Sequence, residues 1–84
     1  MREVINRVIY DTEGEGVVRV YEHHTDWCYQ ALYCGKNGHW FELFQLHDWK
    51  KPRLSAVSRR KAQSWLEGEN LQEALNKYFP LKEA

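Results

Sequence analysis

Two runs of alternating residues joined by a glycine-containing turn constrain the fold of this chain more than any other feature. The first run covers residues 28–34, the second covers residues 39–46, and Gly35-Lys36-Asn37-Gly38 lies between them. Alternation with a period of two is typical of β-strands, and a short turn rich in Gly and Asn favours an antiparallel hairpin. We therefore expect an antiparallel pair of strands here.

The register of this hairpin determines which side chains share a face of the sheet. A two-residue turn and a longer turn are both compatible with the sequence, and we expect the same two faces in either case. One face then holds Leu32, Cys34, Phe41 and Leu43, and the other holds Tyr29, Tyr33, Trp40 and Phe44. Because both faces are largely apolar, we expect one to cover the core and the other to be partly exposed.

Further strands are expected on both sides of the hairpin. Residues 4–10 are rich in β-branched and aromatic side chains, and residues 17–22 alternate in character. Pro52 excludes a central strand from the loop 47–57. We expect residues 54–57 to add only a short edge strand.

Two short helices are predicted after the strands. The first begins at Ser58, a suitable N-cap, and ends near Gly68, and Trp65 on its apolar face is expected to anchor the core. The second begins at Asn70, which with Glu73 resembles a capping box, and ends before the next proline.

Strands followed by helices indicate an α+β fold. We expect a three- to four-stranded antiparallel sheet followed by two short C-terminal helices packed on one face. The 84 residues suffice for one domain, residues 1–84, in which the sheet occupies residues 1–57 and the helices occupy residues 58–79. Four Trp, five Tyr and three Phe supply large apolar side chains for the core of so short a chain.

Composition and hydropathy indicate a globular protein without a membrane partner. Hydrophobic residues make up 43% of the chain and charged residues 29%. No apolar run approaches the ~20 residues that span a bilayer, and the first residues lack the apolar segment of a secretory signal. We therefore expect a cytoplasmic protein in which both cysteines stay reduced.

No residue pattern predicts a catalytic or metal centre. Cys28 and Cys34 lie on one predicted strand, roughly 20 Å apart and beyond disulfide reach, and we expect them to be core residues. The four histidines lack zinc-ligand spacing, no nucleophile signature surrounds a serine or cysteine, and Gly14-Glu15-Gly16 lacks the following glycine of a phosphate-binding loop. We expect no enzyme activity, metal, cofactor or small-molecule substrate, and histidines at the surface.

Charge is distributed unevenly along the chain, although the formal net charge is zero. The first 48 residues carry a net charge of −4 and the remainder +4. Six cations, Lys50, Lys51, Arg53, Arg59, Arg60 and Lys61, occur with no acid among them. The last three lie in the first turn of a predicted helix, where the helix dipole disfavours cations. This indicates a negatively charged partner, and pairing with the acidic first half of the chain stays open as the alternative.

A surplus of aromatic residues is the second indication of a partner. Trp27 and Trp49 fall in predicted loops, and the face that contains Tyr29, Tyr33, Trp40 and Phe44 cannot share one core with the opposite face. Tyr and Trp beside Arg are typical of protein-binding hot spots. The candidate partner-binding residues are therefore Tyr29, Tyr33, Trp40, Trp49, Lys50, Lys51, Arg53, Arg59, Arg60 and Lys61.

Several short motifs carry a resemblance to a known family. They are Ile9-Tyr10-Asp11-Thr12, Leu32-Tyr33 before a glycine-containing turn, Trp40-Phe41 after it, Ala62 with Trp65 in the late helix, and the terminal aromatic Phe79. In these features the chain resembles a family of small bacterial proteins carried on plasmids and phages, although Gly14-Glu15-Gly16 replaces the usual Thr-Ala step. The resemblance implies a mobile-element accessory protein, and some proteins of that kind block host defence nucleases, as anti-CRISPR proteins do.

These observations together predict a non-enzymatic protein-binding module that inhibits a host defence nuclease complex by occlusion. The aromatic sheet face would anchor the partner and the basic segment, residues 50–61, would steer its approach. The alternative is a small nucleic-acid-binding module that uses the same basic segment and the exposed aromatics. The neutral overall charge argues against that alternative.

Overall fold

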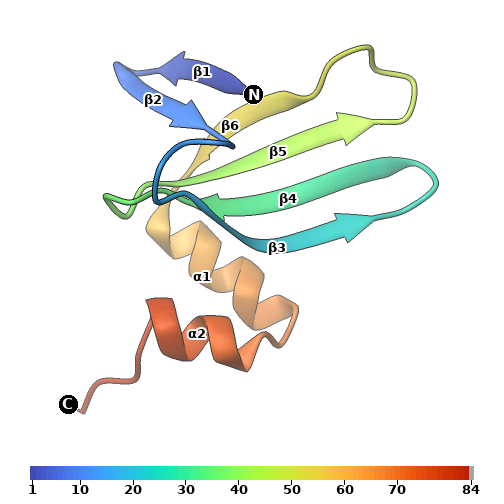
Figure 1. The fold of residues 1–84 in the computed structure, drawn as a ribbon. Coiled ribbons are helices and arrows are strands. Elements are labelled where there is room, and N and C mark those ends of the chain that lie inside the picture. Colours follow the sequence, from blue (N-terminus) through green and yellow to red (C-terminus); the bar gives the residue numbers. More distant parts are fainter. Residues whose placement is uncertain (84) are drawn as a thin grey trace.

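The computed structural model describes residues 1–83, which form six strands and two helices (Figure 1). The strands are β1 (Arg2–Ile5), β2 (Val8–Asp11), β3 (Val18–His24), β4 (Cys28–Cys34), β5 (Trp40–Leu46) and β6 (Arg53–Val57), and the helices are α1 (Arg59–Gly68) and α2 (Gln72–Tyr78). Strands β3-β4-β5-β6 make a four-stranded antiparallel sheet in that order, and β1-β2 make a second, two-stranded one. The predicted α+β fold is confirmed. Neither helix in this part of the chain is long and apolar enough to cross a membrane.

The N-terminal segment forms a hairpin where one strand was expected. Asn6 and Arg7 both have positive φ, 51° and 65°, and they connect Ile5 to its partner Val8. Two consecutive positive φ values are typical of the type I′ turn, whose twist matches that of the flanking strands. The expectation of a continuous strand over residues 4–10 is wrong because Arg7 has a positive φ. Arginine rarely adopts that conformation, so the residue type gave no indication of a turn.

The turn between β4 and β5 sets a register different from the expected one. It contains five residues, 35–39, closed by bonds from Gly35 N to the His39 carbonyl at 2.8 Å and from Gly38 N to the Gly35 carbonyl at 3.0 Å. Trp40 therefore pairs with Cys34, and the next pair on the opposite face is Tyr33 with Phe41. Because the side-chain period is two, an odd-length turn exchanges the faces of one strand, and the expected face assignment is wrong.

Both faces of the four-stranded sheet are covered near this turn. The helices pack on one face and the β1-β2 hairpin lies over the other (Figure 1). The buried residues on the helix side are Leu32, Cys34, Trp40, Val57, Ala62 and Leu66. Those on the hairpin side are Tyr10, Ala31, Tyr33, Phe41 and Leu54. The expectation that one face stays partly exposed is wrong for this half of the sheet, because the N-terminal hairpin covers it.

Both ends of α1 are set by hydrogen bonds between residues close together in the chain. The Ser58 hydroxyl accepts a hydrogen bond from the backbone N of Lys61 at 3.1 Å, which confirms the predicted N-cap. At the other end, Asn70 has a φ of 55° and its N–H donates to the Glu67 carbonyl, while the N–H of Leu71 donates to the Leu66 carbonyl. This pattern is a Schellman motif.

Helix α2 lacks the capping box expected at Asn70. Its N-cap is Leu71, which makes no side-chain cap bond. The expectation is wrong because Asn70 terminates the preceding helix in the left-handed conformation. Trp65, the expected core anchor, is half-buried and meets Tyr21 edge-on, with 6.1 Å between ring centroids.

Candidate binding site

The structure brings four of the predicted partner-binding residues together. Trp49, Lys50, Lys51 and Arg53 lie on the connection between β5 and β6 and on the first residue of β6. We call residues 49–53 the 49–53 loop. The other predicted residues lie elsewhere, for reasons that differ from one to the next.

Tyr33 and Trp40 are buried, so the expectation that they form an exposed aromatic face is wrong. Their exposed fractions are 8% and 2%. Tyr33 stacks on Phe41 beneath the N-terminal hairpin, with 5.2 Å between ring centroids. Trp40 packs on the opposite face under the end of α2. Neither ring is accessible to a partner in this fold.

Tyr29 is half-buried and its hydroxyl is engaged on the hairpin side of the sheet. The hydroxyl donates to the Glu22 carboxylate at 2.7 Å and accepts from Arg19 at 3.4 Å, and Arg19 forms an ion pair with Glu22 at 2.9 Å. Burial, followed by the bond to Glu22, raises the pKa of Tyr29. The arrangement ties β4 to the edge strand β3, and Tyr29 does not join the 49–53 loop.

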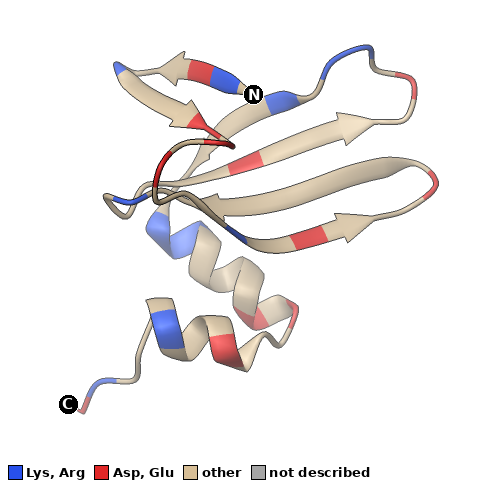
Figure 2. Cartoon of the chain, viewed as in Figure 1, with Lys and Arg blue, Asp and Glu red and all other residues tan. Residues whose placement is uncertain are grey.

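The basic segment does not form one continuous surface. Strand β6 places Arg53 at one end and Arg59 six residues later, which corresponds to roughly 20 Å along an extended chain. Figure 2 shows the two groups of cations as separate regions, one on the loop before β6 and one at the start of α1. Arg60 and Lys61 are exposed beside Arg59.

Arg59 has a structural contact. Its guanidinium donates to the Tyr78 carbonyl at 3.0 Å and lies 4.5 Å from the centre of the Phe79 ring. It therefore holds the end of α2 near the start of α1.

The acidic first half of the chain does not neutralise the basic segment by direct pairing. Within residues 1–83, the ion pair between Arg19 and Glu22 is the one contact between opposite charges within 4.0 Å. None of the six cations of the basic segment takes part in it.

The 49–53 loop holds its aromatic and cationic groups in a fixed stack. The guanidinium of Arg53 lies 4.7 Å from the centre of the Trp49 ring, and that ring meets Phe44 edge-on with 5.5 Å between centroids. The loop backbone is held by bonds from Trp49 N to the Leu46 carbonyl at 3.0 Å and from Gln45 Nε2 to the Trp49 carbonyl at 3.2 Å. The half-buried indole therefore has one defined orientation.

The sheet beyond the helices continues this surface. Cross-strand pairing places Gln30, Phe44 and Arg53 side by side with His23 on the helix side of the sheet, and all four are exposed or half-buried. Trp27 is 78% exposed at the neighbouring turn, which is joined to the end of β5 by a bond from His47 N to the Trp27 carbonyl at 2.7 Å. The sequence analysis did not select Phe44 as a site residue, and only the true register could have placed it beside Arg53.

Charge in this region is mixed, with a positive excess. Lys50, Lys51 and Arg53 are exposed, and Glu3 and Asp48 line the same shallow hollow beneath the loop. The two lysines extend from a loop whose backbone is fixed. In the part of the chain that the structure describes, neither lysine is held in an ion pair that an acidic group on another molecule would have to break.

The two cysteines and four histidines are of the residue types that most often bind transition metals. Cys34 belongs to the helix-side core, as expected, and burial raises the pKa of its thiol. Cys28 is half-buried and lies outside both core clusters, with its sulfur 3.6 Å from the Thr25 hydroxyl, so the expectation of a core residue is wrong for Cys28. All four histidines are exposed, as expected. Among residues 1–83, no three His, Cys, Asp or Glu side chains gather in a way that could hold a metal ion.

The fold and this region describe a small α+β domain that presents an aromatic and basic loop at one end of its sheet. Comparisons with protein-family models, curated proteins and solved structures gave no match to the chain. The function is therefore argued from the geometry of the loop and its surroundings.

Proposed function

We propose that this protein is a non-enzymatic protein-binding module whose contact surface is the 49–53 loop together with Trp27. The observation that carries the proposal is the stack of Arg53 on Trp49 on Phe44, which is in place without a partner. Trp and Arg are the residues most enriched in protein-binding hot spots. An indole already held in one orientation loses little conformational entropy on binding.

The partner surface that fits this loop is acidic. Lys50 and Lys51 follow Trp49 directly and form no ion pair within residues 1–83, so they are available to steer a negatively charged protein. The exposed ring of Trp27 adds apolar area at the same end of the sheet. The sequence analysis assigned the anchor to the aromatic sheet face and the steering to the basic segment. We propose the same two roles here, with Trp49 and Trp27 as the aromatic anchor.

A narrower version of the proposal is inhibition of a host defence nuclease by occlusion. It is supported by the resemblance to plasmid- and phage-borne proteins. In this version the domain acts by covering a surface of its target, and no bond is made or broken.

The experiment compares two charge reversals of equal size at opposite ends of β6. The tagged protein is used as bait in bacterial lysate, with and without nuclease treatment. Lys50→Glu with Lys51→Glu and, separately, Trp49→Ala alter the proposed surface. Arg60→Glu with Lys61→Glu makes the same change of charge at the start of α1 and is the matched control.

We expect a protein retained in stoichiometric amounts after nuclease treatment, lost with both changes in the 49–53 loop and kept with the control. Removal of a hot-spot Trp typically costs 2 kcal/mol or more, roughly a 30-fold loss of affinity. Loss with the control alone would place the interface at α1 and contradict the proposal. Equal loss with both double variants would indicate a dependence on total charge only.

A nucleic-acid partner is the second candidate, because Trp49 and Arg53 could also stack on unpaired bases. It predicts retention that disappears with nuclease and binding to a single-stranded oligonucleotide that weakens steeply as salt rises. That result would replace the protein-binding proposal.

A further inference from the structure

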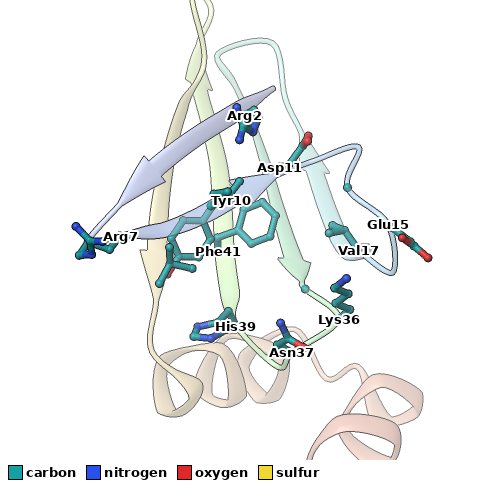
Figure 3. Close-up of a pocket in the computed structure, with 14 residues that line it drawn as sticks. Arg2, Arg7, Tyr10, Asp11, Glu15, Val17, Lys36, Asn37, His39 and Phe41 are labelled. Carbon is teal, nitrogen blue, oxygen red and sulfur yellow. The ribbon is translucent and has the colours of Figure 1, made fainter.

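We infer that the protein has a second site, a pocket on the hairpin side of the sheet that binds a small organic anion carrying a flat ring. The pocket has a volume of about 580 Å³ and lies between the β1-β2 hairpin, the loop before β3 and the β4-β5 turn (Figure 3). This volume falls within the range of about 300–1,000 Å³ typical of small-molecule sites. The β4-β5 turn lies at the end of the sheet opposite the 49–53 loop (Figure 1), so the inference does not depend on the proposed function.

The floor of the pocket is aromatic. Tyr10 and Phe41 line it, with exposed fractions of 7% and 1%, and their ring centroids are 5.3 Å apart. Phe41 in turn stacks on Tyr33 at 5.2 Å, which supports the floor from within the core. Phe41 is covered and holds Tyr10 in place from beneath, so a flat ring in the ligand can meet the exposed edge of Tyr10. Ring pairs gain about 0.5–1.5 kcal/mol beyond area burial.

Three polar side chains border the floor from a single turn. Lys36, Asn37 and His39 lie along one side of the two rings (Figure 3). Their backbone is fixed by the two hydrogen bonds that close the β4-β5 turn. An ammonium, an amide and an imidazole N–H are donors suited to a carboxylate or phosphate.

Gly16 packs directly against the stem of Lys36. A β-carbon at Gly16 would lie 2.6 Å from Cβ of Lys36, and Gly16 has a φ of 73°. Only glycine combines this close approach with this backbone conformation at little cost. The contact limits the directions that the lysine side chain can take and keeps it at the border of the pocket.

The charges around the pocket favour an anion. Arg2, Arg7 and Lys36 line it together with Asp11 and Glu15, which leaves one positive charge in excess. Asp11 Oδ1 accepts a hydrogen bond from the backbone N of Glu13 at 2.9 Å, and the Glu15 carboxylate points away from the rings (Figure 3). Within residues 1–83 no carboxylate lies within 4.0 Å of the Lys36 ammonium.

The experiment uses the full chain and three simple probes. A fluorinated benzoate supplies both a ring and a carboxylate, the matching fluorinated benzamide supplies the ring without the charge, and acetate supplies the charge without the ring. Binding is measured by fluorine NMR for the first two, and by backbone amide shifts of Asn37 and His39 for all three. Lys36→Gln is the test variant, and Lys61→Gln at the exposed start of α1 is the matched control.

We expect the benzoate to bind more tightly than either of the other probes and to shift the amides of the β4-β5 turn. Lys36→Gln should weaken it by about five- to tenfold, the effect of one charge-assisted hydrogen bond at a partly exposed site, and Lys61→Gln should leave it unchanged. Equal affinity for benzoate and benzamide would overturn the inference, and so would equal effects of the two lysine variants. The absence of benzoate binding at about 10 mM would also overturn it, because that concentration is well above the ~1 mM dissociation constant of a weak site. None of these outcomes depends on whether a protein binds the 49–53 loop.

Discussion

At the residue scale, the indole of Trp40 holds the last helix against the sheet. It stacks on Phe79 with 5.4 Å between ring centroids and meets Tyr78 edge-on at 5.1 Å. Its Nε1 is buried without a hydrogen-bond partner among the described residues, which costs about 1–3 kcal/mol. Burial of the large ring against two others outweighs that cost, because truncation of a buried Trp typically loses about 3–5 kcal/mol.

Arg59 completes this arrangement and gives a prediction at the same scale. Arg59→Ala removes both the bond to the Tyr78 carbonyl and the contact with the Phe79 ring. We expect the free energy of unfolding to fall by about 1–2 kcal/mol, since the side chain is exposed and each contact is partly screened. Urea denaturation followed by Trp fluorescence measures the change.

Arg60→Ala is the control for that prediction. Arg60 is the next residue of the same helix turn and is exposed, and among the described residues no ion pair or side-chain hydrogen bond involves it. Its replacement should change the free energy of unfolding by less than about 0.5 kcal/mol. Equal effects of the two changes would show that the Arg59 contacts contribute nothing to stability.

At the scale of elements, the N-terminal hairpin depends on an unusual turn. Asn6 and Arg7 both have positive φ, and Asn tolerates this conformation far better than Arg does. The Arg7 backbone therefore carries strain that glycine would not. The two strands pair in spite of it because the hairpin buries Tyr10 against the sheet.

Relief of this strain gives the second prediction. Arg7→Gly should raise the free energy of unfolding by about 0.5–1 kcal/mol, the strain relieved less the greater backbone entropy of glycine in the unfolded chain. Asn6→Gly should be close to neutral, because Asn already suits its conformation. Thermal unfolding followed by circular dichroism measures both, and a loss of stability with Arg7→Gly would contradict the argument from strain.

At the scale of the whole molecule, the four-stranded sheet is a shared layer between two separate cores. Helices cover one face and the N-terminal hairpin covers the other, so β4, β5 and β6 each contribute buried residues to both clusters, while β3 packs only at the margin of the helix-side cluster. The helices and the N-terminal hairpin lie over the end of the sheet near the β4-β5 turn. The opposite end, with the 49–53 loop and Trp27, is left open to a partner.

The contribution of the hairpin layer gives the third prediction. Tyr10 and Ile9 are neighbours on β2, but Tyr10 is buried in the hairpin-side core and Ile9 is 57% exposed. Tyr10→Ala should lower the free energy of unfolding by about 3–4 kcal/mol, whereas Ile9→Ala should change it by less than about 0.5 kcal/mol.

Urea denaturation measures both variants, and a stabilising osmolyte allows the measurement if Tyr10→Ala is largely unfolded. Tyr10→Phe keeps the ring and should stay within about 1.5 kcal/mol of the original. Small and equal effects of Tyr10→Ala and Ile9→Ala would show that the hairpin does not pack on the sheet.

The candidate site shows where sequence reasoning is limited. Trp49, Lys50, Lys51 and Arg53 are adjacent in the chain, so any structure of the connection keeps them together. Their relation to Phe44 depends on the register, and the separation of Arg59 from Arg53 depends on the length of β6. Tyr33 and Trp40 were assigned to a surface because no local pattern reveals that a distant hairpin and a distant helix cover them.

The sequence by itself determined the features that depend on neighbouring residues. Alternation of side chains, the Ser58 cap and the glycine-containing turn specify strands, a helix start and a hairpin through contacts a few residues apart. Tertiary structure alone decided which faces are buried. Helices α1 and α2 covered the face that holds Trp40, and the N-terminal hairpin covered the other because Tyr10 loses water against that face of the sheet.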